Sequence, residues 1–311
     1  MVSKTKIFID GSAGTTGLRI FERLKNREDI ELITLSEANR KDINARKTAI
    51  NSADIVFLCL PDAAAIEAVS ICENKNTVII DASTAHRTNP DWDYGFPELS
   101  DDFCKNIAKS KRIANPGCHA SGFIALVYPL VKAGILDKNA LLTCFSITGY
   151  SGGGKQMIAD YESEDRDVLL SAPRQYGIKQ VHKHLPEMAA VTGLCNAPVF
   201  SPIVADFYSG MEVTVPLFKE MINGSIEDIK KIYAEQYNTS IVKYVSDFDE
   251  GGFVSANKLS GSDGMEISVS GNDDRVLLIA RYDNLGKGAS GAAIECMNIV
   301  MGVDKTKGLV L

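Results

Sequence analysis

Residues 5–35 constrain the fold of this chain more than any other stretch. The β-rich segment TKIFID at 5–10 runs into the glycine-rich GSAGTTG at 11–17, then into the helical LRIFERLKN and the β-rich ELITL at 31–35. A strand, a glycine loop, a helix and a second strand within about 30 residues predict a βαβ unit that holds a dinucleotide. A plain glycine-rich turn is the alternative, and the position of the loop between strand and helix favours the dinucleotide site.

The three glycines of this loop are spaced as GxxGxxG, and each has a physical role in such a site. Gly11 permits the tight turn, Gly14 lets the backbone approach a pyrophosphate closely, and Gly17 allows the helix to pack near the strand. The N-terminus of the following helix faces the anion with its backbone amides. The predicted contacts are Gly11, Ser12, Ala13, Gly14, Thr15, Thr16 and Gly17.

The residues after the second strand favour NADP over NAD. Sites for NAD usually place an Asp or Glu there, on the ribose 2′-hydroxyl. This chain has Ser36 followed by Arg40 and Lys41, which suit a 2′-phosphate. Glu37 is the contrary feature, and Arg40 with Lys41 also fits a solvated helix start.

Strand-like segments recur at 54–60, 77–83 and 111–115, with a helical segment at 62–74. Alternating strands and helices predict a parallel, doubly wound sheet, so the expected fold class is α/β and Rossmann-like. Ligands of such sheets bind beyond the carboxyl ends of the strands. We therefore expect one crevice to collect the residues that follow these strands, which are Gly11, Leu60, Pro61, Ser83 and residues 116–118.

Cys118 stands in ANPGCHASG, at the start of an apolar helical pattern that ends at Gly134. The amides and the dipole at a helix N-terminus favour a thiolate. A buried packing cysteine is the alternative, and the position after a strand and before a helix favours a nucleophile.

The histidines indicate acid/base chemistry. In VHKHLPE at 181–187, an extended chain would place His182 and His184 on one side, with Glu187 able to orient one of them. A histidine near Cys118 would act first as general base and then as acid. Spacing alone also allows a surface histidine pair or a metal site, and we rank the metal below acid/base chemistry and expect none.

Two further segments are candidate anion sites. STAHR at 83–87 offers two hydroxyls and a guanidinium just after a strand, or else an N-cap with a surface charge. YSGGGK at 150–155 offers a nest of backbone amides with Lys155, or else a flexible turn. A phosphorylated or carboxylated substrate would explain both segments.

The composition restricts the class of partner. The 311 residues carry a net charge of −7, with 45% hydrophobic and 23% charged residues and seven scattered cysteines. This balance fits a globular protein that binds small molecules, and neither nucleic acid nor an anionic membrane. No apolar run approaches the roughly 18 residues of a membrane span and no signal peptide is visible, so we expect a cytoplasmic protein.

Seven motifs taken together resemble the N-acetyl-gamma-glutamyl-phosphate reductases, in their shorter type, over nearly the whole chain. They are FIDGSAGTTG, DASTAHR, YGFPEL, ANPGCHASG, GYSGGGK, HKHLPE and DNLGKGASG. The resemblance implies NADPH-dependent reduction of N-acetyl-L-glutamyl 5-phosphate to N-acetyl-L-glutamate 5-semialdehyde, in arginine biosynthesis, through a cysteine thioester. NADP(H) is the implied cofactor.

The resemblance also implies roles for individual residues. Cys118 is the nucleophile, and His184, oriented by Glu187, is the acid/base. The implied substrate contacts are Ser83, Thr84, Arg87, Asn115, Ser151, Gly152, Lys155 and His182. Besides the glycine loop, the cofactor contacts are Ser36, Arg40, Lys41, Leu60, Pro61, Ser83, Asn284 beside the nicotinamide, and Gly286.

A non-contiguous first domain follows from these assignments. Residues 1–118 plus 285–311 are expected to bind NADP, and residues 119–284 to form an α+β catalytic and oligomerisation domain like that of semialdehyde dehydrogenases. The resemblance implies a homodimer or a homotetramer.

Strand patterns at 143–148, 211–218 and 275–283 predict a mostly antiparallel sheet in this second domain, with helices on one side. One of these helices is expected at 225–237, with Ser225 as its N-cap.

Two alternative functions remain open: the same kind of reaction on another substrate, and a protein without catalytic activity. The near rival is another acyl-phosphate or semialdehyde dehydrogenase, acting on aspartate or on an aminoadipate derivative. The remote rival is an NADP sensor that keeps the fold without catalysis. Such a sensor would lack the nucleophile or the base, and this chain has both Cys118 and His184.

Overall fold

The computed structural model describes residues 4–311, which form two compact units. The first unit contains residues up to Pro97, Asp101–Gly117 and Ala289–Leu309, and the second contains Glu98–Ser100, Cys118–Gly288 and Val310–Leu311. The expected domains divide the chain differently at residues 98–100, 118, 285–288 and 310–311. Residues 1–3 of the expected first domain lie outside the described residues.

The first unit is built on a six-stranded sheet in the order β2-β1-β3-β4-β6-β5, in which every pairing is parallel. Its strands are β1 (Thr5–Asp10), β2 (Ile30–Ile33), β3 (Ile55–Leu58), β4 (Val78–Asp81), β5 (Asp93–Tyr94) and β6 (Arg112–Ala114). Its helices are α1 (Thr15–Leu24), α2 (Ile43–Ser52), α3 (Asp62–Ser70), α4 (Asp101–Lys109) and α9 (Gly291–Met301). The prediction of a parallel, doubly wound sheet is confirmed, although α2, α4 and the short β5 were not predicted.

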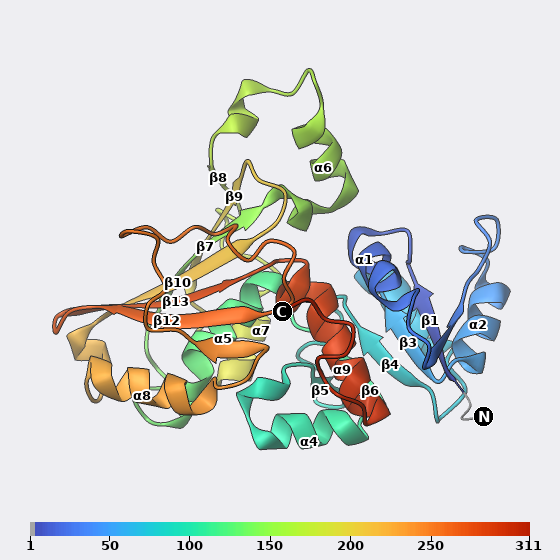
Figure 1. Cartoon of the computed structure of the whole chain (residues 1–311), viewed down its shortest axis with the longest axis horizontal. Helices are drawn as coiled ribbons and strands as arrows, with labels where there is room; N and C mark the ends of the chain where they lie inside the picture. The colour runs from blue at the N-terminus through green and yellow to red at the C-terminus, as the bar shows by residue number, and fades with distance from the viewer. Residues whose placement is uncertain (1–3) are drawn as a thin grey trace. The chain divides into compact units, whose positions relative to one another are not determined.

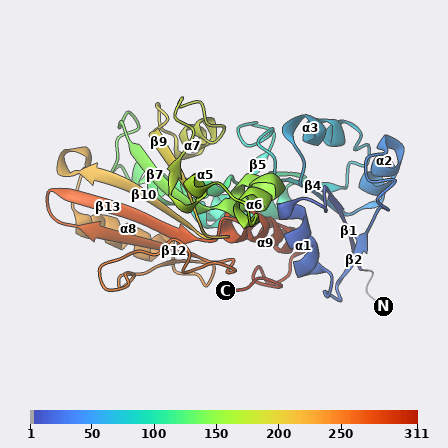
Figure 2. The ribbon, with the colours of Figure 1, turned by 90° about the horizontal axis from the view of Figure 1, so that it is seen from above.

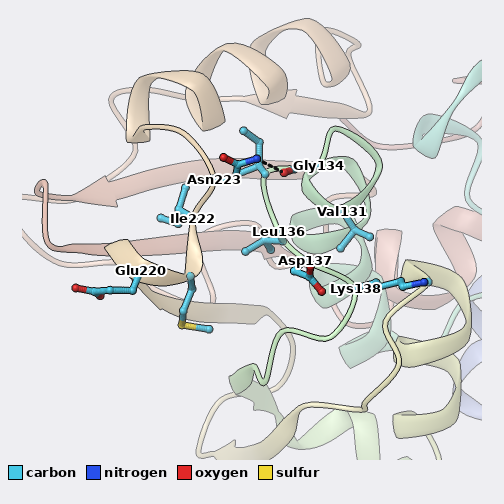
Figure 3. Close-up of a pocket in the computed structure, with 11 residues that line it drawn as sticks. Val131, Gly134, Leu136, Asp137, Lys138, Glu220, Ile222 and Asn223 are labelled. Carbon is cyan, nitrogen blue, oxygen red and sulfur yellow. Dashed lines mark hydrogen bonds between the residues drawn. The ribbon is translucent and has the colours of Figure 1, made fainter.

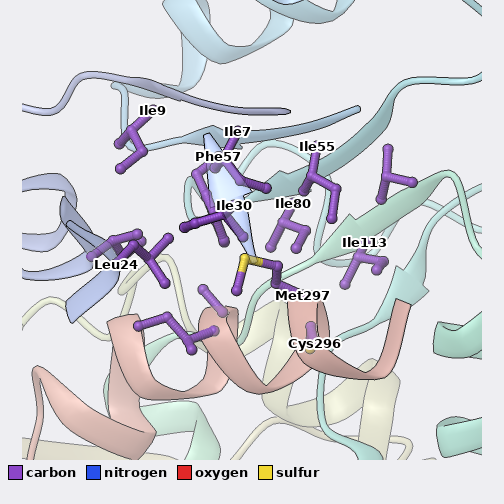
Figure 4. Packing of buried hydrophobic residues seen from close by; sticks show 14 of the residues in the cluster. Ile7, Ile9, Leu24, Ile30, Ile55, Phe57, Ile80, Ile113, Cys296 and Met297 are labelled. Atoms are coloured by element: carbon purple, nitrogen blue, oxygen red, sulfur yellow. The ribbon is translucent and has the colours of Figure 1, made fainter. Parts of the chain in front are cut away.

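Helices cover both faces of this sheet, with α1 and α9 on one side and α2 and α3 on the other (Figure 2). Alternate residues of the strands are buried on opposite faces, so Ile7 packs with Met297 of α9 while Phe8 packs with Ile50 of α2. Figure 4 shows the first of these two cores, where strand residues meet α1 and α9. Strands buried on both faces explain their nearly continuous apolar sequences.

The second unit is built on a seven-stranded mixed sheet in the order β11-β12-β13-β10-β7-β9-β8 (Figure 1). Four of its six pairings are antiparallel, as predicted. Its strands are β7 (Thr143–Gly149), β8 (Arg174–Gln175), β9 (Val199–Ala205), β10 (Met211–Phe218), β11 (Val242–Tyr244), β12 (Met265–Gly271) and β13 (Arg275–Tyr282).

The helices of the second unit are α5 (Cys118–Lys132), α6 (Gly154–Glu162), α7 (Leu185–Thr192) and α8 (Ile226–Gln236). A π-helix at Gly286–Ser290 begins in this unit, and its last two residues belong to the first unit. Helices α5 and α8 pack on the sheet, and α7 packs against α5. Ser225 caps α8 in a capping box with Asp228, which confirms the predicted N-cap. Within residues 4–311, every helix is too short or too polar to span a bilayer.

Candidate active site

The glycine loop of the first unit follows β1 and is closed tightly on itself. Gly11 has φ +88°, and a Cβ at this position would overlap the carbonyl oxygen of Cys59. A Cβ on Gly17 would overlap the carbonyl oxygen of Gly11, so α1 begins directly against the loop. Gly14 donates its N–H to Gly11 O at 2.9 Å and forms the N-cap of α1 without a side-chain cap. The chain therefore needs glycine at 11 and 17 merely to form this loop.

This loop lies at the point where the order of the strands reverses. The chain passes from β1 to β2 on one side and to β3 on the other, and β1 lies between these two strands. Because all pairings are parallel, Gly11, Leu60 and Ser83 follow strands whose carboxyl ends share one edge of the sheet. Open parallel sheets bind ligands at such a switch point.

Ser36, Arg40 and Lys41 are exposed in the turn between β2 and α2. The guanidinium of Arg40 pairs with the carboxylate of Glu37 at 3.0 Å. Glu37, the residue that counts against NADP, is therefore paired with the arginine predicted to bind the 2′-phosphate. Asp42 accepts a hydrogen bond from the N–H of Ala45 and forms the N-cap of α2. Arg40 and Lys41 thus precede this helix, which agrees with the helix-start alternative as well as with a phosphate site.

The segment after β4 is organised by two carboxylates, Asp81 and Asp62, to which the sequence analysis gave no role. Asp81 is fully buried and accepts from the N–H of Ser83 at 2.9 Å and from its hydroxyl at 2.7 Å. Nδ1 of His86 lies 2.6 Å from the same carboxylate. Asp62 likewise accepts from the N–H and hydroxyl of Thr84. The hydroxyl protons of Ser83 and Thr84 are therefore committed to carboxylates, and both side chains serve first to hold this loop.

Arg87 and Asn115 lie together in the same unit. Arg87 donates from Nε to the carbonyl of Asn115 at 2.9 Å and from Nη2 to the carbonyl of Ala82 at 3.0 Å. The buried amide of Asn115 donates to the carbonyl of Ala289 at 3.0 Å. The guanidinium is thus fixed by carbonyls beyond β4 and β6, at the edge where the glycine loop also lies.

In the second unit, Cys118 is half-buried and begins α5, as predicted. The next residue, His119, is buried among two other histidines: its ring centroid lies 5.8 Å from that of His182 and 5.6 Å from that of His184. The rings of His182 and His184 are 4.7 Å apart. The fold therefore gathers three of the four histidines around the start of the helix that carries Cys118.

His119 is neutral in this surrounding. Burial, with the nearby His182, lowers its pKa to about 3. Its Nδ1 lies 2.6 Å from Oγ of Ser146 on β7, and its Nε2 lies 2.6 Å from the hydroxyl of Tyr176. Sequence analysis assigned no role to Ser146 or Tyr176, because nothing in the spacing connects them to residue 119.

The backbone around His182 and His184 differs from the prediction. An extended chain was expected, but residues 183–184 form a turn and His184 is the N-cap of α7, with helical φ −84° and ψ −13°. The turn is closed by the N–H of Leu185, which donates to the carbonyl of His182 at 3.0 Å, and the N–H of His184 donates to Nδ1 of His182 at 3.2 Å. The two rings still come together, but through this turn rather than through β alternation. Glu187 is buried in the first turn of α7.

The segment YSGGGK forms a 3-10 helix at Tyr150–Gly153 followed by α6, and not a flexible turn. Oγ of buried Ser151 accepts a hydrogen bond from the amide of Asn284 at 3.0 Å. The carbonyl oxygen of that amide accepts from the N–H of Gly210 at 2.9 Å. Ser151, predicted to contact the substrate, and Asn284, predicted to contact the cofactor, are therefore joined by a hydrogen bond. Lys155 is exposed.

A buried ion pair joins two residues to which the sequence analysis gave no role, one in YGFPEL and one in DNLGKGASG. Nζ of Lys287, in the π-helix, lies 2.7 Å from the carboxylate of Glu98, and both side chains are almost completely buried. A Cβ on the neighbouring Gly286 would overlap the carbonyl oxygen of Ser262. The π-helix is thus held by charge and by close backbone packing within the second unit.

A pocket of about 810 Å³ lies at the other end of α5, away from its first turn (Figure 3). Val131, Leu136, Lys138 and Ile222 line it, and none of the predicted site residues does. Across residues 4–311, no three or more His, Cys, Asp or Glu side chains are grouped so that they could hold a metal ion.

Comparison with protein families assigns both units to one class. Residues 6–107 match the NAD binding domain of semialdehyde dehydrogenase, and residues 118–284 match the semialdehyde dehydrogenase dimerisation domain. Among solved structures, aspartate semialdehyde dehydrogenase II from Vibrio cholerae superposes with a TM-score of 0.72 at 16% identity, over 96% of this chain and 99% of that one. The aspartate semialdehyde dehydrogenase from Francisella tularensis gives 0.72 at 15% identity, over 96% and 100%. Fold and domain content define a protein of the semialdehyde dehydrogenase class.

Curated relatives narrow this class. N-acetyl-gamma-glutamyl-phosphate reductase 2 from Nostoc sp. is 42% identical over 99% of this chain and 100% of its own length. N-acetyl-gamma-glutamyl-phosphate reductase from Brucella ovis is 45% identical over 96% and 99%. The chain belongs to the N-acetyl-gamma-glutamyl-phosphate reductase family.

Proposed function

We propose that this protein catalyses the NADPH-dependent reduction of N-acetyl-L-glutamyl 5-phosphate to N-acetyl-L-glutamate 5-semialdehyde, with release of phosphate, in arginine biosynthesis. The observation that carries the proposal is the position of Cys118 as the first residue of α5, beside His119 and the histidine pair of residues 182 and 184. A cysteine at a helix N-terminus near a histidine has the two groups that acyl transfer to sulfur requires.

The glycine loop fits the pyrophosphate of NADP. Gly11 and Gly17 leave no room for a Cβ, and the N-cap of α1 is the backbone of Gly14 rather than a polar side chain. Such a loop presents backbone amides to an anion at a helix N-terminus. Arg40 and Lys41 would meet the 2′-phosphate. The remaining proposed cofactor contacts are Ser36, Leu60, Pro61, Ser83, Asn284 and Gly286. When bound, NADPH supplies the hydride that reduces the acyl group.

Cys118 forms the covalent link to the substrate. His184 takes the proton of the Cys118 thiol, the thiolate attacks the acyl carbon, a C–S bond forms, and the C–O bond to phosphate breaks, so that phosphate leaves with the electron pair. The first amides of α5 stabilise the thiolate. After reduction of the thioester, His184 protonates the oxygen of the thiohemiacetal and takes the proton back as the C–S bond breaks. The aldehyde is released and Cys118 returns as a thiolate.

Glu187 and Arg87 would support these steps. Glu187, buried in the same first turn of α7, orients His184. Arg87 is a cation held by the carbonyls of Ala82 and Asn115, and it neutralises the phosphate or the carboxylate of the substrate. Ser83, Thr84, Asn115, Ser151, Gly152, Lys155 and His182 are the remaining proposed substrate contacts.

A homodimer or a homotetramer fits the free face of the second sheet. Val213 of β10 faces α5, where its Cγ2 atom would contact a Cβ on Gly122, so its neighbour Thr214 faces the other way. Phe145 pairs with Thr214 on that far face and is 48% exposed, and Val199 on β9 is 58% exposed. An exposed apolar face on a strand-rich unit suits burial against a second copy.

The test is reduction of NADP⁺ by purified protein given N-acetyl-L-glutamate 5-semialdehyde, with and without inorganic phosphate. We expect phosphate-dependent turnover that Cys118→Ser abolishes, while Cys195→Ser, which alters an exposed cysteine, leaves it unchanged. Turnover retained in Cys118→Ser would refute the thioester mechanism. Turnover only with aspartate semialdehyde or an aminoadipate derivative would identify the rival substrates, and NADP⁺ binding without turnover would identify a sensor.

A further inference from the structure

The hydroxyl of Tyr282 lies in the first turn of α5. It donates to the carbonyl oxygen of Cys118 at 2.5 Å and accepts from the N–H of Gly122 at 3.0 Å. Residues 118 and 122 lie four positions apart at the start of this helix, the spacing at which a carbonyl and an N–H pair in an α-helix. A side chain on β13 thus bridges the two backbone groups that would otherwise close the first turn on each other.

The surroundings of this hydroxyl are built to admit it. Tyr282 is completely buried, so its ring has one position. A Cβ on Gly122 would lie 2.7 Å from the hydroxyl oxygen and 2.9 Å from a ring carbon of Tyr282. Any side chain at position 122 would therefore push the tyrosine out of the turn.

The segment that begins with Tyr282 also contacts Cys118 from a second direction. A Cβ on Gly288 would lie 3.1 Å from Cβ of Cys118 and 3.4 Å from its Cα. Gly288 is in the π-helix that follows β13, and the Lys287–Glu98 ion pair anchors that helix. The backbone and the Cβ of Cys118 are thus confined by two residues only six positions apart.

We propose that Tyr282 and Gly288 are positioning residues for the Cys118 thiol. The tyrosine hydroxyl fixes the backbone position of the first turn of α5, and the absence of a side chain at Gly288 leaves room for the Cys118 side chain. This inference rests on the proposed role of Cys118 as nucleophile. A displacement of about 1 Å in a reacting group can cost about a hundredfold in rate. Neither residue needs to touch the substrate to have this effect.

The same helix supplies a matched control. Tyr237 is also completely buried, and its hydroxyl donates to the carbonyl of Ala125 at 2.6 Å, two turns further along α5. Tyr237→Phe and Tyr282→Phe each remove one buried hydroxyl that donates to a backbone carbonyl of this helix. Only the second change affects the turn that carries Cys118.

The experiment measures alkylation of Cys118 by iodoacetamide in the protein without substrate or cofactor, as a function of pH, with peptide mass spectrometry to separate Cys118 from the other cysteines. We expect Tyr282→Phe to change the rate constant or the midpoint of the pH profile and to lower kcat by about tenfold to a hundredfold. Tyr237→Phe should lower the melting temperature while the profile of Cys118 stays that of the wild type.

Identical profiles for Tyr282→Phe, Tyr237→Phe and the wild type would overturn the inference, even if both variants melt earlier. Should Tyr282→Phe fail to fold, Gly288→Ala tests the same idea, since its methyl group would press on Cβ of Cys118; an unchanged profile and kcat there would also overturn it. If Cys118→Ser retains turnover, the proposed mechanism fails first, and the alkylation profiles still report whether Tyr282 positions the thiol.

Discussion

Nε2 of His119 lies 2.6 Å from the hydroxyl oxygen of Tyr176, and the histidine is buried beside the proposed nucleophile. Burial, with the nearby His182, lowers the pKa of His119 to about 3, against about 6.5 in an unfolded chain. Between these two values the unfolded state binds one proton more than the folded state, so this residue makes stability fall as the pH falls below about 6.5.

We therefore expect His119→Gln to flatten the acid limb of the stability profile. The wild type should lose up to about 1.4 kcal/mol per pH unit from this residue as the pH falls between those pKa values, and the variant should not. Melting temperatures of both proteins at about pH 7, 6 and 5 check this. Parallel pH profiles would mean that His119 is protonated, or exposed, in the folded protein.

The glycine loop gives a prediction in which the same substitution at two of its glycines has different results. Gly11→Ala should lower the melting temperature, because φ +88° and the carbonyl of Cys59 exclude a Cβ. Gly14→Ala should leave stability nearly unchanged, since φ is −76° and the nearest atom to a Cβ lies 3.4 Å away. Gly14→Ala should still lower the affinity for NADPH, because the added methyl group would stand where the backbone is proposed to approach the pyrophosphate. Calorimetry and fluorescence titration measure the two effects, and equal NADPH affinity in Gly14→Ala and the wild type would contradict the proposed approach.

The ion pair of Lys287 and Glu98 should be costly to break. Glu98→Gln leaves a buried ammonium without its counter-charge, and such changes cost about 3 to 5 kcal/mol. Glu227→Gln removes the partner of Lys230 in an exposed pair, where the cost is about 0 to 1 kcal/mol. Denaturant unfolding of both variants tests the difference. A loss in Glu98→Gln no larger than in Glu227→Gln would show that water reaches Lys287.

Local patterns predicted the local structure well. The bounds of β1 and β10 are those of the predicted segments, and Ser225 is the N-cap expected from its position before an apolar helical pattern. Helix α2 was missed because its sequence INARKTAINS has no strong apolar periodicity; its one start signal is Asp42, the N-cap. The turn before His184 was also missed, although Pro186 and Glu187 are typical of a first helical turn and predicted α7 better than alternation predicted a strand.

The partners within the site were beyond sequence reasoning for a physical reason. Asp81 controls Ser83 and His86 from the end of β4, and its signal was an acidic residue after an apolar strand, which the DASTAHR motif contains. Ser146 and Tyr176 reach His119 from 27 and 57 residues away, through the register of the second sheet. Spacing along a chain does not encode which residues a sheet brings together.

Arg87 gives a prediction that depends on shape as well as charge. Arg87→Lys keeps the positive charge but cannot bond two carbonyls from one planar group, as Nε and Nη2 do here. We expect the KM for inorganic phosphate in the reverse reaction to rise by about tenfold, the size of one charge-assisted hydrogen bond. Arg166→Lys, which alters an arginine held by Asp206, should leave that KM unchanged. Equal KM values in Arg87→Lys and Arg166→Lys would show that Arg87 does not contact the phosphate group.

The preference for NADP should depend on a competition for Arg40. Its guanidinium pairs with Glu37 at 3.0 Å, and both side chains are exposed, so the pair contributes at most about 1 kcal/mol. Glu37→Gln frees the guanidinium for the 2′-phosphate, and we expect NADPH to bind up to about fivefold more tightly. Arg40→Ala should lower the affinity for NADPH by about tenfold and leave the affinity for NADH unchanged, because NADH has no phosphate at that position. Fluorescence titration with both nucleotides separates these outcomes. If Arg40→Ala weakens both nucleotides equally, Arg40 contributes general charge and does not select NADP.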